Sequence, residues 1–186
     1  MQAQHLCCLP KECKMQPLEG KYLRLRPVEI EDLEHLYRYE NDAEMWVVSN
    51  HLNPISRFYL EQYILHAEND IYKDKQLRLI IETHDKTCVG IIDLFDFDPH
   101  HKRAAVGIII DPKHRRKAYG AEAIDVIKAY ARDVLQLKQL FCGIGSDNKG
   151  SIRLFRQKGF EITGTRKAWR LHKDGWHDEH FLQLLF

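Results

Sequence analysis

The segment from Val106 to Asp133 joins an apolar run, a basic turn and a helical pattern without a break. Val106 to Ile110 is apolar apart from its one glycine, which favours a buried strand. Asp111 to Lys117 is polar and basic, and apolar residues then recur at helical spacing. The N–H groups in the first turn of a helix have no intrahelical partner, and the helix dipole makes this end positive. This order of elements therefore predicts a phosphate-binding site where the helix begins.

A second segment, from Asp147 to Phe160, has the composition of a short helix with a marked beginning and end. Asn148 is suited to cap the helix, and Gly159 is suited to end it. Leu154 and Phe155 are its candidate core residues. The two segments lie about thirty residues apart, each between predicted strands.

The whole chain predicts one α/β domain around a mixed sheet. The expected strands cover about residues 22–26, 77–82, 88–97, 103–110, 139–145, 161–170 and 180–186, and the expected helices about 30–37, 56–67, 119–133 and 151–158. Residues 1–19 have no period of their own and are predicted to form an N-terminal tail. Residues 20–186 are long enough to bury a core of their own and form the predicted domain.

The composition excludes several classes of partner. Lys and Arg number 28 and Asp and Glu 27, so no overall field attracts nucleic acid or an anionic membrane, and any anion site is local. No apolar run is long enough to span a membrane. The five cysteines show no repeated spacing, which argues against a zinc site and a disulfide framework. We therefore expect a cytoplasmic protein with no metal, no nucleic acid partner and no membrane partner.

The two segments together resemble the acyl-CoA site of the Gcn5-related N-acetyltransferase (GNAT) family. The family's phosphate turn has the pattern Arg/Gln-x-x-Gly-x-Gly/Ala, which here reads Arg115-Arg-Lys-Ala-Tyr-Gly120. The second family motif is similar to Asn148-x-x-Ser-x-x-Leu-Phe-x-x-x-Gly-Phe160. The resemblance covers about residues 20–186. Leu23 to Pro27 and Asp174 to Asp178 are similar to the branch of spermidine N-acetyltransferases and ribosomal-protein alanine N-acetyltransferases.

This resemblance implies an α/β fold with a mixed, largely antiparallel sheet, splayed at the acyl-CoA site and flanked by about four helices. It implies acetyl-CoA as co-substrate, with backbone groups of β-strand residues binding pantetheine like an added strand. The N–H of Ile109 is the oxyanion donor that it suggests. The implied acyl-CoA-binding residues are Ile108, Ile109, Ile110, Arg115, Arg116, Lys117, Ala118, Tyr119, Gly120, Ala121, Asn148, Ser151 and Phe155.

Two residues depart from the family pattern. Ala118 replaces a glycine of the phosphate turn, and because alanine tolerates helical angles we expect weaker binding rather than none. Phe155 stands where many relatives have the tyrosine that protonates the leaving thiolate, and phenylalanine has no proton to donate. Ser151, Ser146 or water can take this task, or coenzyme A leaves as a thiolate.

Acetyl transfer to an amine needs a neutral amine, so a base is useful. Asp93, Asp96 and Asp98 lie on one predicted strand or at its end. In a regular strand Asp96 and Asp98 share one face and Asp93 points to the other. By resemblance an acid on this strand is the usual base, and Asp96 is the first choice. Asp93 and Ser151 are the other catalytic candidates, and Asp98 reads equally well as a turn former.

We predict direct acetyl transfer to a primary amine: a polyamine such as spermidine, another small amine, or a protein N-terminus. Acidic residues between Glu29 and Glu44 would suit a polyamine, although a solvated helical face is the favoured explanation for them. The apolar last strand, 181–186, suits either the core or the interface of a homo-oligomer. The alternative function is an acyl-CoA-binding regulatory protein that has lost catalysis, which Ala118 and Phe155 keep open.

Overall fold

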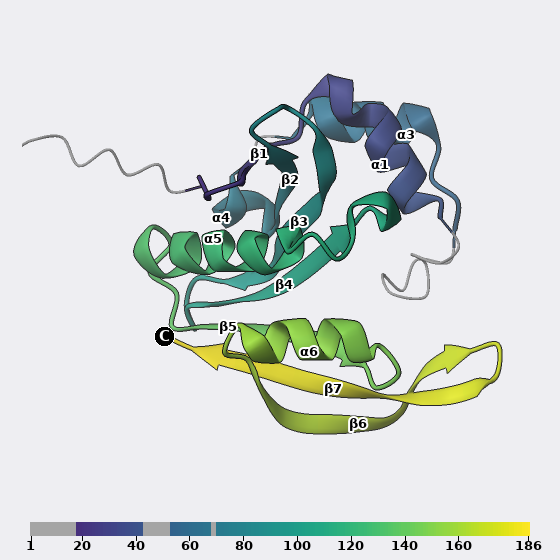
Figure 1. Cartoon of the computed structure of the whole chain (residues 1–186), viewed down its shortest axis with the longest axis vertical. Helices are drawn as coiled ribbons and strands as arrows, with labels where there is room; N and C mark the ends of the chain where they lie inside the picture. Colours follow the sequence, from purple (N-terminus) through teal and green to yellow (C-terminus); the bar gives the residue numbers. More distant parts are fainter. Residues whose placement is uncertain (1–17, 43–52, 68–69) are drawn as a thin grey trace, which may run out of the picture.

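The computed structural model describes residues 18–42, 53–67 and 70–186 (Figure 1). Most of the predicted tail therefore lies outside the described residues, as does part of the acidic segment, including Glu44.

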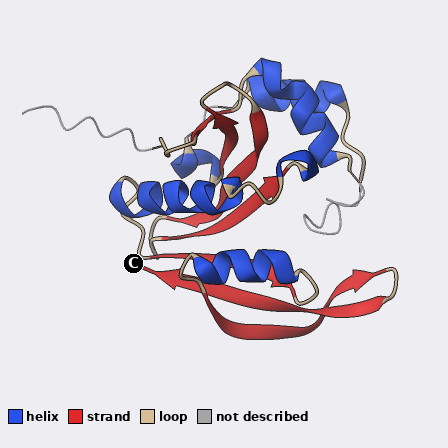
Figure 2. Cartoon of the chain, viewed as in Figure 1, coloured by secondary structure: helices blue, strands red, loops and turns tan. Residues whose placement is uncertain are grey.

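Seven strands form one sheet in the order β1-β2-β3-β4-β5-β7-β6 (Figure 2). The strands are β1 (Leu23–Pro27), β2 (Leu77–Thr83), β3 (Cys88–Asp98), β4 (Arg103–Ile110), β5 (Gln139–Gly145), β6 (Glu161–His172) and β7 (Gly175–Leu185). The α-helices of the described ranges are α1 (Leu33–Glu40), α3 (Arg57–Leu65), α4 (Ile71–Asp74), α5 (Tyr119–Asp133) and α6 (Lys149–Gln157). Among these described strands only β4 and β5 pair in parallel, so the predicted mixed, largely antiparallel sheet is confirmed.

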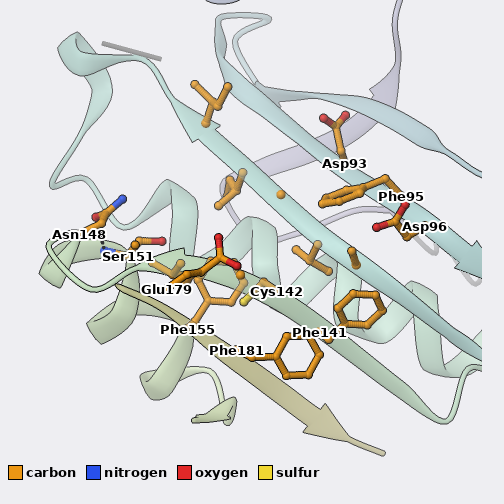
Figure 3. Close-up of a pocket in the computed structure, with 18 of the residues that line it drawn as sticks. Asp93, Phe95, Asp96, Phe141, Cys142, Asn148, Ser151, Phe155, Glu179 and Phe181 are labelled. Carbon is orange, nitrogen blue, oxygen red and sulfur yellow. Dashed lines mark hydrogen bonds between the residues drawn. The ribbon is translucent and has the colours of Figure 1, made fainter. Parts of the chain in front are cut away.

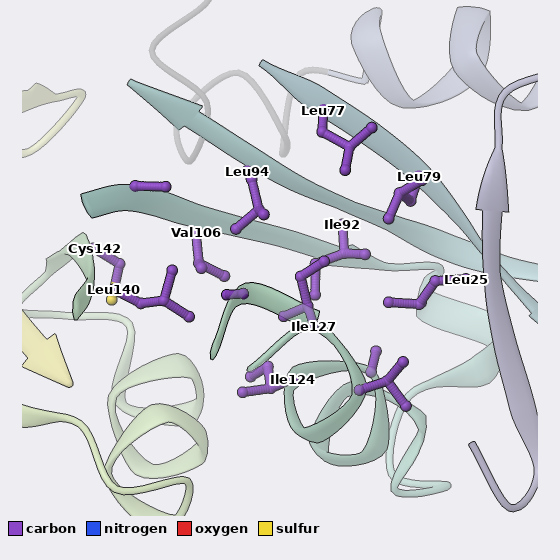
Figure 4. Close-up of a cluster of buried hydrophobic side chains, with 14 of the residues drawn as sticks. Leu25, Leu77, Leu79, Ile92, Leu94, Val106, Ile124, Ile127, Leu140 and Cys142 are labelled. Atoms are coloured by element: carbon purple, nitrogen blue, oxygen red, sulfur yellow. The ribbon is translucent and has the colours of Figure 1, made fainter. Parts of the chain in front are cut away.

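Both faces of the sheet are covered, because its central strands are apolar on both sides. Ile124 and Ile127 of α5 pack on one face, in the larger of two buried clusters, which also includes Ile92 of β3 (Figure 4). Leu36 of α1 and Leu60 of α3 pack on the other face, in the smaller cluster. Among the described residues, no helix is long and apolar enough to cross a membrane.

The structure adds one short helix to the predicted elements and corrects the boundaries of the last two strands. Helix α4 is absent from the prediction because four residues are too few to show a helical period; Asp70 caps it by accepting from the N–H of Tyr72 at 2.9 Å. Strand β7 begins at Gly175 rather than at 180, and β6 extends to His172. Most of β6 is exposed, so it lacks the alternation of apolar and polar residues that marks a half-buried strand.

The acidic residues around α1 are of two kinds: Glu29 and Glu31 are exposed, as the solvated face predicts, whereas Asp32 and Glu40 are buried in ion pairs. Asp32 is buried and accepts two hydrogen bonds from Arg26, at 2.6 and 2.9 Å. Burial by itself would raise the pKa of Asp32, but the bonds from Arg26 outweigh it and hold that pKa below its ordinary value. Glu40 is also buried and bonds Arg78 at 2.6 Å. The favoured sequence-based explanation is therefore wrong for these two residues.

Candidate active site

Strands β4 and β5 diverge after a short stretch of pairing. Arg103 to Ala105 pair with Gln139 to Phe141, whereas β4 stays paired to β3 as far as Ile110. The second half of β4 therefore has one edge without a neighbouring strand.

Two hydrogen bonds show which backbone N–H and C=O groups of β4 point to its free edge. The N–H of Asp111 donates to the carbonyl of Val89 in β3, at 2.9 Å. Arg115 donates through Nε to the carbonyl oxygen of Ile110 at 3.2 Å, so that carbonyl faces away from β3. Because hydrogen bonding alternates along an antiparallel strand, the backbone groups of Ile108 face the free edge and those of Ile109 face β3.

A cleft of about 870 Å³ opens where the two strands diverge. This volume lies within the range of small-molecule sites in proteins. Asp93, Phe95 and Asp96 line it from β3, and Figure 3 shows them across from residues of β5, α6 and β7. The residues labelled on that opposite side are Phe141, Cys142, Asn148, Ser151, Phe155, Glu179 and Phe181.

The basic turn lies beyond this cleft, at the start of α5. Arg115, Arg116 and Lys117 are exposed, and no carboxylate of the described residues pairs with them. The N–H groups in the first turn of α5 have no intrahelical partners. A Cβ at Gly120 would lie 3.4 to 3.8 Å from the side chains of Ile108, Ile110 and Leu154, which is ordinary van der Waals contact. The turn therefore offers positive charge and free donors.

Ala118 caps α5 in the left-handed conformation, with φ 63° and ψ 2°. The expectation that alanine would adopt helical angles here is wrong, because this position lies in the region that favours glycine. The neighbouring Arg116 also has φ 63°. Tyr119 and Ala121 belong to the first turn of the helix itself.

Replacement of Ala118 by glycine is expected to raise the free energy of unfolding by up to about 1 kcal/mol, because it relieves the left-handed strain. Urea unfolding of the purified chain measures this change. The matched control, Ala129→Gly inside α5, is expected to lower stability by about 0.5–1 kcal/mol. If both variants lose stability equally, Ala118 does not adopt the left-handed conformation in solution.

The beginning of α6 forms one end of the cleft. Asn148 caps the helix through Oδ1, which accepts from the N–H of Ser151 at 3.0 Å. Ser151 and Phe155 are one helical turn apart and both line the cleft. Phe155 is only 2% exposed and packs edge-on against Phe160, with ring centroids 5.0 Å apart. The helix therefore offers a hydroxyl at Ser151 and an apolar ring at Phe155.

A break in the register of β3 changes the predicted faces of its aspartates. The pairing with β4 shifts between Phe95 and Asp98, and Asp96 has φ 48°, as in a β-bulge. Asp93 and Asp96 consequently line the same cleft, so the prediction that they point to opposite sides is wrong. Asp98 lies outside the cleft lining and accepts from the N–H of His101 at 2.9 Å, which supports its reading as a turn former.

The two aspartates of β3 that line the cleft differ in their partners. Asp93 accepts two hydrogen bonds from Arg78, at 3.0 and 3.1 Å, and Arg78 also bonds Glu40. Burial disfavours the charged guanidinium, but Asp93 and Glu40 outweigh it and raise the pKa of Arg78 above its ordinary value. The carboxylate of Asp96 has no hydrogen bond or ion pair with any described residue and is exposed. Asp96 is therefore open to a bound molecule, whereas both oxygens of Asp93 are occupied.

Glu179 is a buried acid of the cleft that the sequence did not indicate. Its carboxylate accepts from Arg166 at 2.8 Å and from Arg170 at 2.7 Å. It lies against Gly143, where a Cβ would come within 2.8 Å of Oε1 and the carboxylate would have to shift. Burial and the charge of Glu179 raise the pKa of the neighbouring Cys142 thiol to about 12. Cys142 is therefore a protonated, buried thiol.

Residues 22–161 match the family of acetyltransferase (GNAT) domains, Acetyltransf_3. The chain belongs to the GNAT family. Its relatives include spermidine N(1)-acetyltransferase of Escherichia coli (strain K12), 27% identical over 148 residues that cover 76% of this chain and 74% of that protein. The uncharacterized N-acetyltransferase YoaA of Bacillus subtilis (strain 168) is 27% identical over 164 residues, covering 82% and 86%.

A solved structure agrees with the GNAT fold. Spermidine N-acetyltransferase from Vibrio cholerae, in complex with CoA and spermine, superimposes with a TM-score of 0.81 at 21% identity, over 88% of this chain and 95% of that one. The resemblance inferred from the two segments is thus confirmed, and as a GNAT enzyme the chain transfers an acetyl group from acetyl-CoA to an amine nitrogen.

In this GNAT fold the acyl-CoA-binding residues inferred from the family stay a prediction, and the structure shows how they are arranged. The free edge of β4, the first turn of α5 and the beginning of α6 surround the divergence of β4 and β5. The directions of the backbone groups of β4 change one detail of that prediction, the residue whose N–H is the oxyanion donor. The N–H of Ile108 rather than that of Ile109 faces the free edge, where a thioester carbonyl would need a donor.

Proposed function

We propose that the acetyl acceptor is a polyamine and that Asp96 is the base. The supporting observation is the net charge of the part of the cleft that lies next to β3. Four carboxylates line this part, those of Glu40, Asp74, Asp93 and Asp96, against the two cations Lys75 and Arg78, which leaves a net charge of −2. A polyamine carries several ammonium groups near neutral pH, so the excess negative charge favours it over a monoamine.

Asp96 is suited to receive the reacting amine because its carboxylate is free of other partners. A primary amine has a pKa of about 10, so most of it carries a proton that must leave before attack. Asp96 attracts the ammonium group and accepts this proton, directly or through a water molecule. Asp93 has a positioning role, because it holds Arg78 next to the same wall.

The neutral amine then attacks the thioester carbonyl, and the N–H of Ile108 stabilises the oxygen as it becomes negative. As the C–S bond of the tetrahedral intermediate breaks, coenzyme A leaves as a thiolate, and the nitrogen gives up its second proton to Ser151 or water, which leaves the acetylated amine. The thiolate leaves readily because a thiol has a pKa of about 8.5. Cys142 is a poor donor to it, with a pKa of about 12. Ser151 or water therefore supplies the proton.

We also propose that the chain forms a homo-oligomer. A spermidine N-acetyltransferase from Vibrio cholerae has been described as dodecameric. In this chain β7 is paired on both sides and Leu182 is fully buried, so neither edge of the last strand is free to pair with a second copy. The edge strand β6 is exposed and has one row of unpaired backbone groups, which supports self-association there instead.

The acceptor is tested by following thiol release from acetyl-CoA with spermidine, butylamine and a short peptide with a free N-terminal alanine. We expect kcat/KM to be at least about 10-fold higher for spermidine than for butylamine, which corresponds to about 1.4 kcal/mol. This advantage should shrink at high salt, which screens charge. Equal kcat/KM for the two amines, preference for the peptide, or no turnover with spermidine would each contradict the proposal.

A further inference from the structure

Three phenylalanine rings line the cleft next to the acidic residues of β3. They are Phe95 of β3, Phe141 of β5 and Phe181 of β7, and Figure 3 shows the first across the cleft from the other two. The side chain of Phe95 is exposed, and its ring lies against Gly107, where a Cβ would come within 3.3 Å of Cε1. Because Gly107 precedes Ile108, this ring lies next to the proposed oxyanion donor. The catalytic steps proposed above use none of the three rings.

The register of the sheet places two of these rings on opposite sides of one small residue. Ala105 of β4 pairs with Phe95 on one side and with Phe141 on the other. Residues that pair directly across a sheet have their side chains on the same face. Neighbouring strands lie about 4.8 Å apart, so the Cα atoms of Phe95 and Phe141 are separated by about 10 Å. The methyl group of Ala105 therefore forms the floor of a channel that has an aromatic ring on each side.

The backbone of this floor is paired within the sheet. At Ala105 strand β4 is paired with both β3 and β5, and at Phe141 strand β5 is paired with both β4 and β7. Backbone N–H and C=O groups that are paired in a sheet are not available to a bound molecule. A polar chain in the channel, such as a peptide backbone, would therefore have buried polar groups without partners, which is unfavourable.

The charged groups around the channel are distributed unevenly. The cleft lining next to β3 has the net charge of −2 given above. On the side of the β6–β7 hairpin the net charge is zero with His172 neutral, because two arginines face two carboxylates, those residues being Arg166, Arg170, Asp147 and Glu179. Only the β3 side therefore attracts an ammonium group, and the chain that joins the nitrogens of the acceptor lies next to the rings.

We propose that the channel formed by Phe95, Ala105 and Phe141 binds the hydrocarbon chain of the acceptor and restricts the acceptor to alkyl amines. Carbon atoms in contact are about 3.5–4.0 Å apart, so one methylene chain between two rings needs about 7–8 Å. The separation of about 10 Å between the two backbones accommodates this chain. The channel has this role only if the acceptor binds in the cleft with its ammonium groups next to β3, so the inference rests on the proposed function.

The test compares two diamines of equal length and equal charge, with thiol release from acetyl-CoA as the readout. They are cadaverine and its ether analogue, in which an oxygen atom replaces the central methylene group. We expect kcat/KM for cadaverine to exceed that for the ether by at least about 10-fold, because the ether oxygen loses its water without gaining a donor. The oxygen also lowers the pKa of the amines, so the decisive quantity is the change of this ratio between variants.

The variants alter one side of the channel at a time. Phe95→Asn and Phe141→Asn, which introduce a polar partner, should each lower the ratio to less than about 3-fold, whereas the apolar Phe95→Leu should keep most of the preference. The matched control is Phe58→Asn on α3, because Phe58 is exposed and lies outside the cleft lining. It should change the ratio less than about twofold. A loss of stability alone lowers kcat/KM for both amines equally and leaves the ratio unchanged.

Several outcomes would overturn the channel. They are equal kcat/KM for the two diamines in the parent enzyme, an unchanged ratio in both Phe95→Asn and Phe141→Asn, and an equal fall of the ratio in Phe58→Asn. Because the two diamines carry the same charge, their ratio does not depend on whether charge favours a polyamine. If butylamine is as good an acceptor as spermidine, the polyamine proposal fails, and pentylamine with its ether analogue then tests the channel in the same way. No turnover of any of these amines would also overturn it.

Discussion

The variant Asp96→Asn is expected to lower kcat with acetyl-CoA and spermidine by about 100-fold or more, which is the usual contribution of a general base. The amide keeps the size of the side chain but cannot accept the proton of the ammonium group. Affinity for acetyl-CoA should not change, because the predicted acyl-CoA-binding residues lie on β4, in the basic turn, at the start of α5 and at the beginning of α6. Initial rates of thiol release and calorimetric titration with acetyl-CoA measure the two effects separately.

The matched control is Asp98→Asn, two residues along the same strand. Asp98 accepts from the N–H of His101 and bonds Arg103 at 3.2 Å, outside the cleft lining. Its replacement should leave kcat within about twofold of the parent enzyme, as for a surface residue away from the site. The two variants should also differ in their response to pH.

The reduction in kcat caused by Asp96→Asn should become smaller as the pH approaches the pKa of the amine, about 10, because the amine then loses its proton without a base. A purely structural defect would persist at every pH. Unchanged kcat in Asp96→Asn at neutral pH would remove Asp96 from the catalytic mechanism and direct attention to Asp93.

Local sequence signals were sufficient to predict the positions of the elements that carry the predicted acyl-CoA-binding residues. The strand ending at Ile110, the basic turn and the helix from Tyr119 to Asp133 are adjacent in the chain, and the structure has them at the same positions. Asn148 also caps α6 as predicted, because capping depends on the N–H of a residue only three positions away. Neighbours in sequence determine each of these features.

The arrangement of the acids depends on contacts between distant segments and was not predicted. One extra residue in β3 turns Asp96 to the same cleft as Asp93, and a period of two cannot show such a bulge. Glu179 lies just before the strand predicted from residue 180, and its role appears only when Arg166 and Arg170 are placed beside it. The left-handed angle of Ala118 was missed for a different reason, since the residue itself gives no sign of it.

Replacement of Arg78 by methionine is expected to produce the largest loss of stability, about 3 kcal/mol or more. Arg78 is 17% exposed and bonds two carboxylates that are themselves largely buried, those of Glu40 and Asp93. Methionine keeps the apolar part of the side chain but leaves two like charges without their cation. Urea unfolding at pH 7, in parallel with the parent chain, measures the loss.

Two further variants separate the loss of the cation from the loss of packing. In Arg24→Met the arginine removed is 40% exposed and pairs with Glu82, which keeps a second bond to Arg26, so the loss should stay below about 1 kcal/mol. The double variant Arg78→Met/Asp93→Asn should recover part of the stability lost in Arg78→Met, because one of the uncompensated charges is gone. If the double variant is less stable than Arg78→Met, Arg78 stabilises the fold through packing rather than through its charge. The shape of the cleft next to β3 would then not depend on this ion pair.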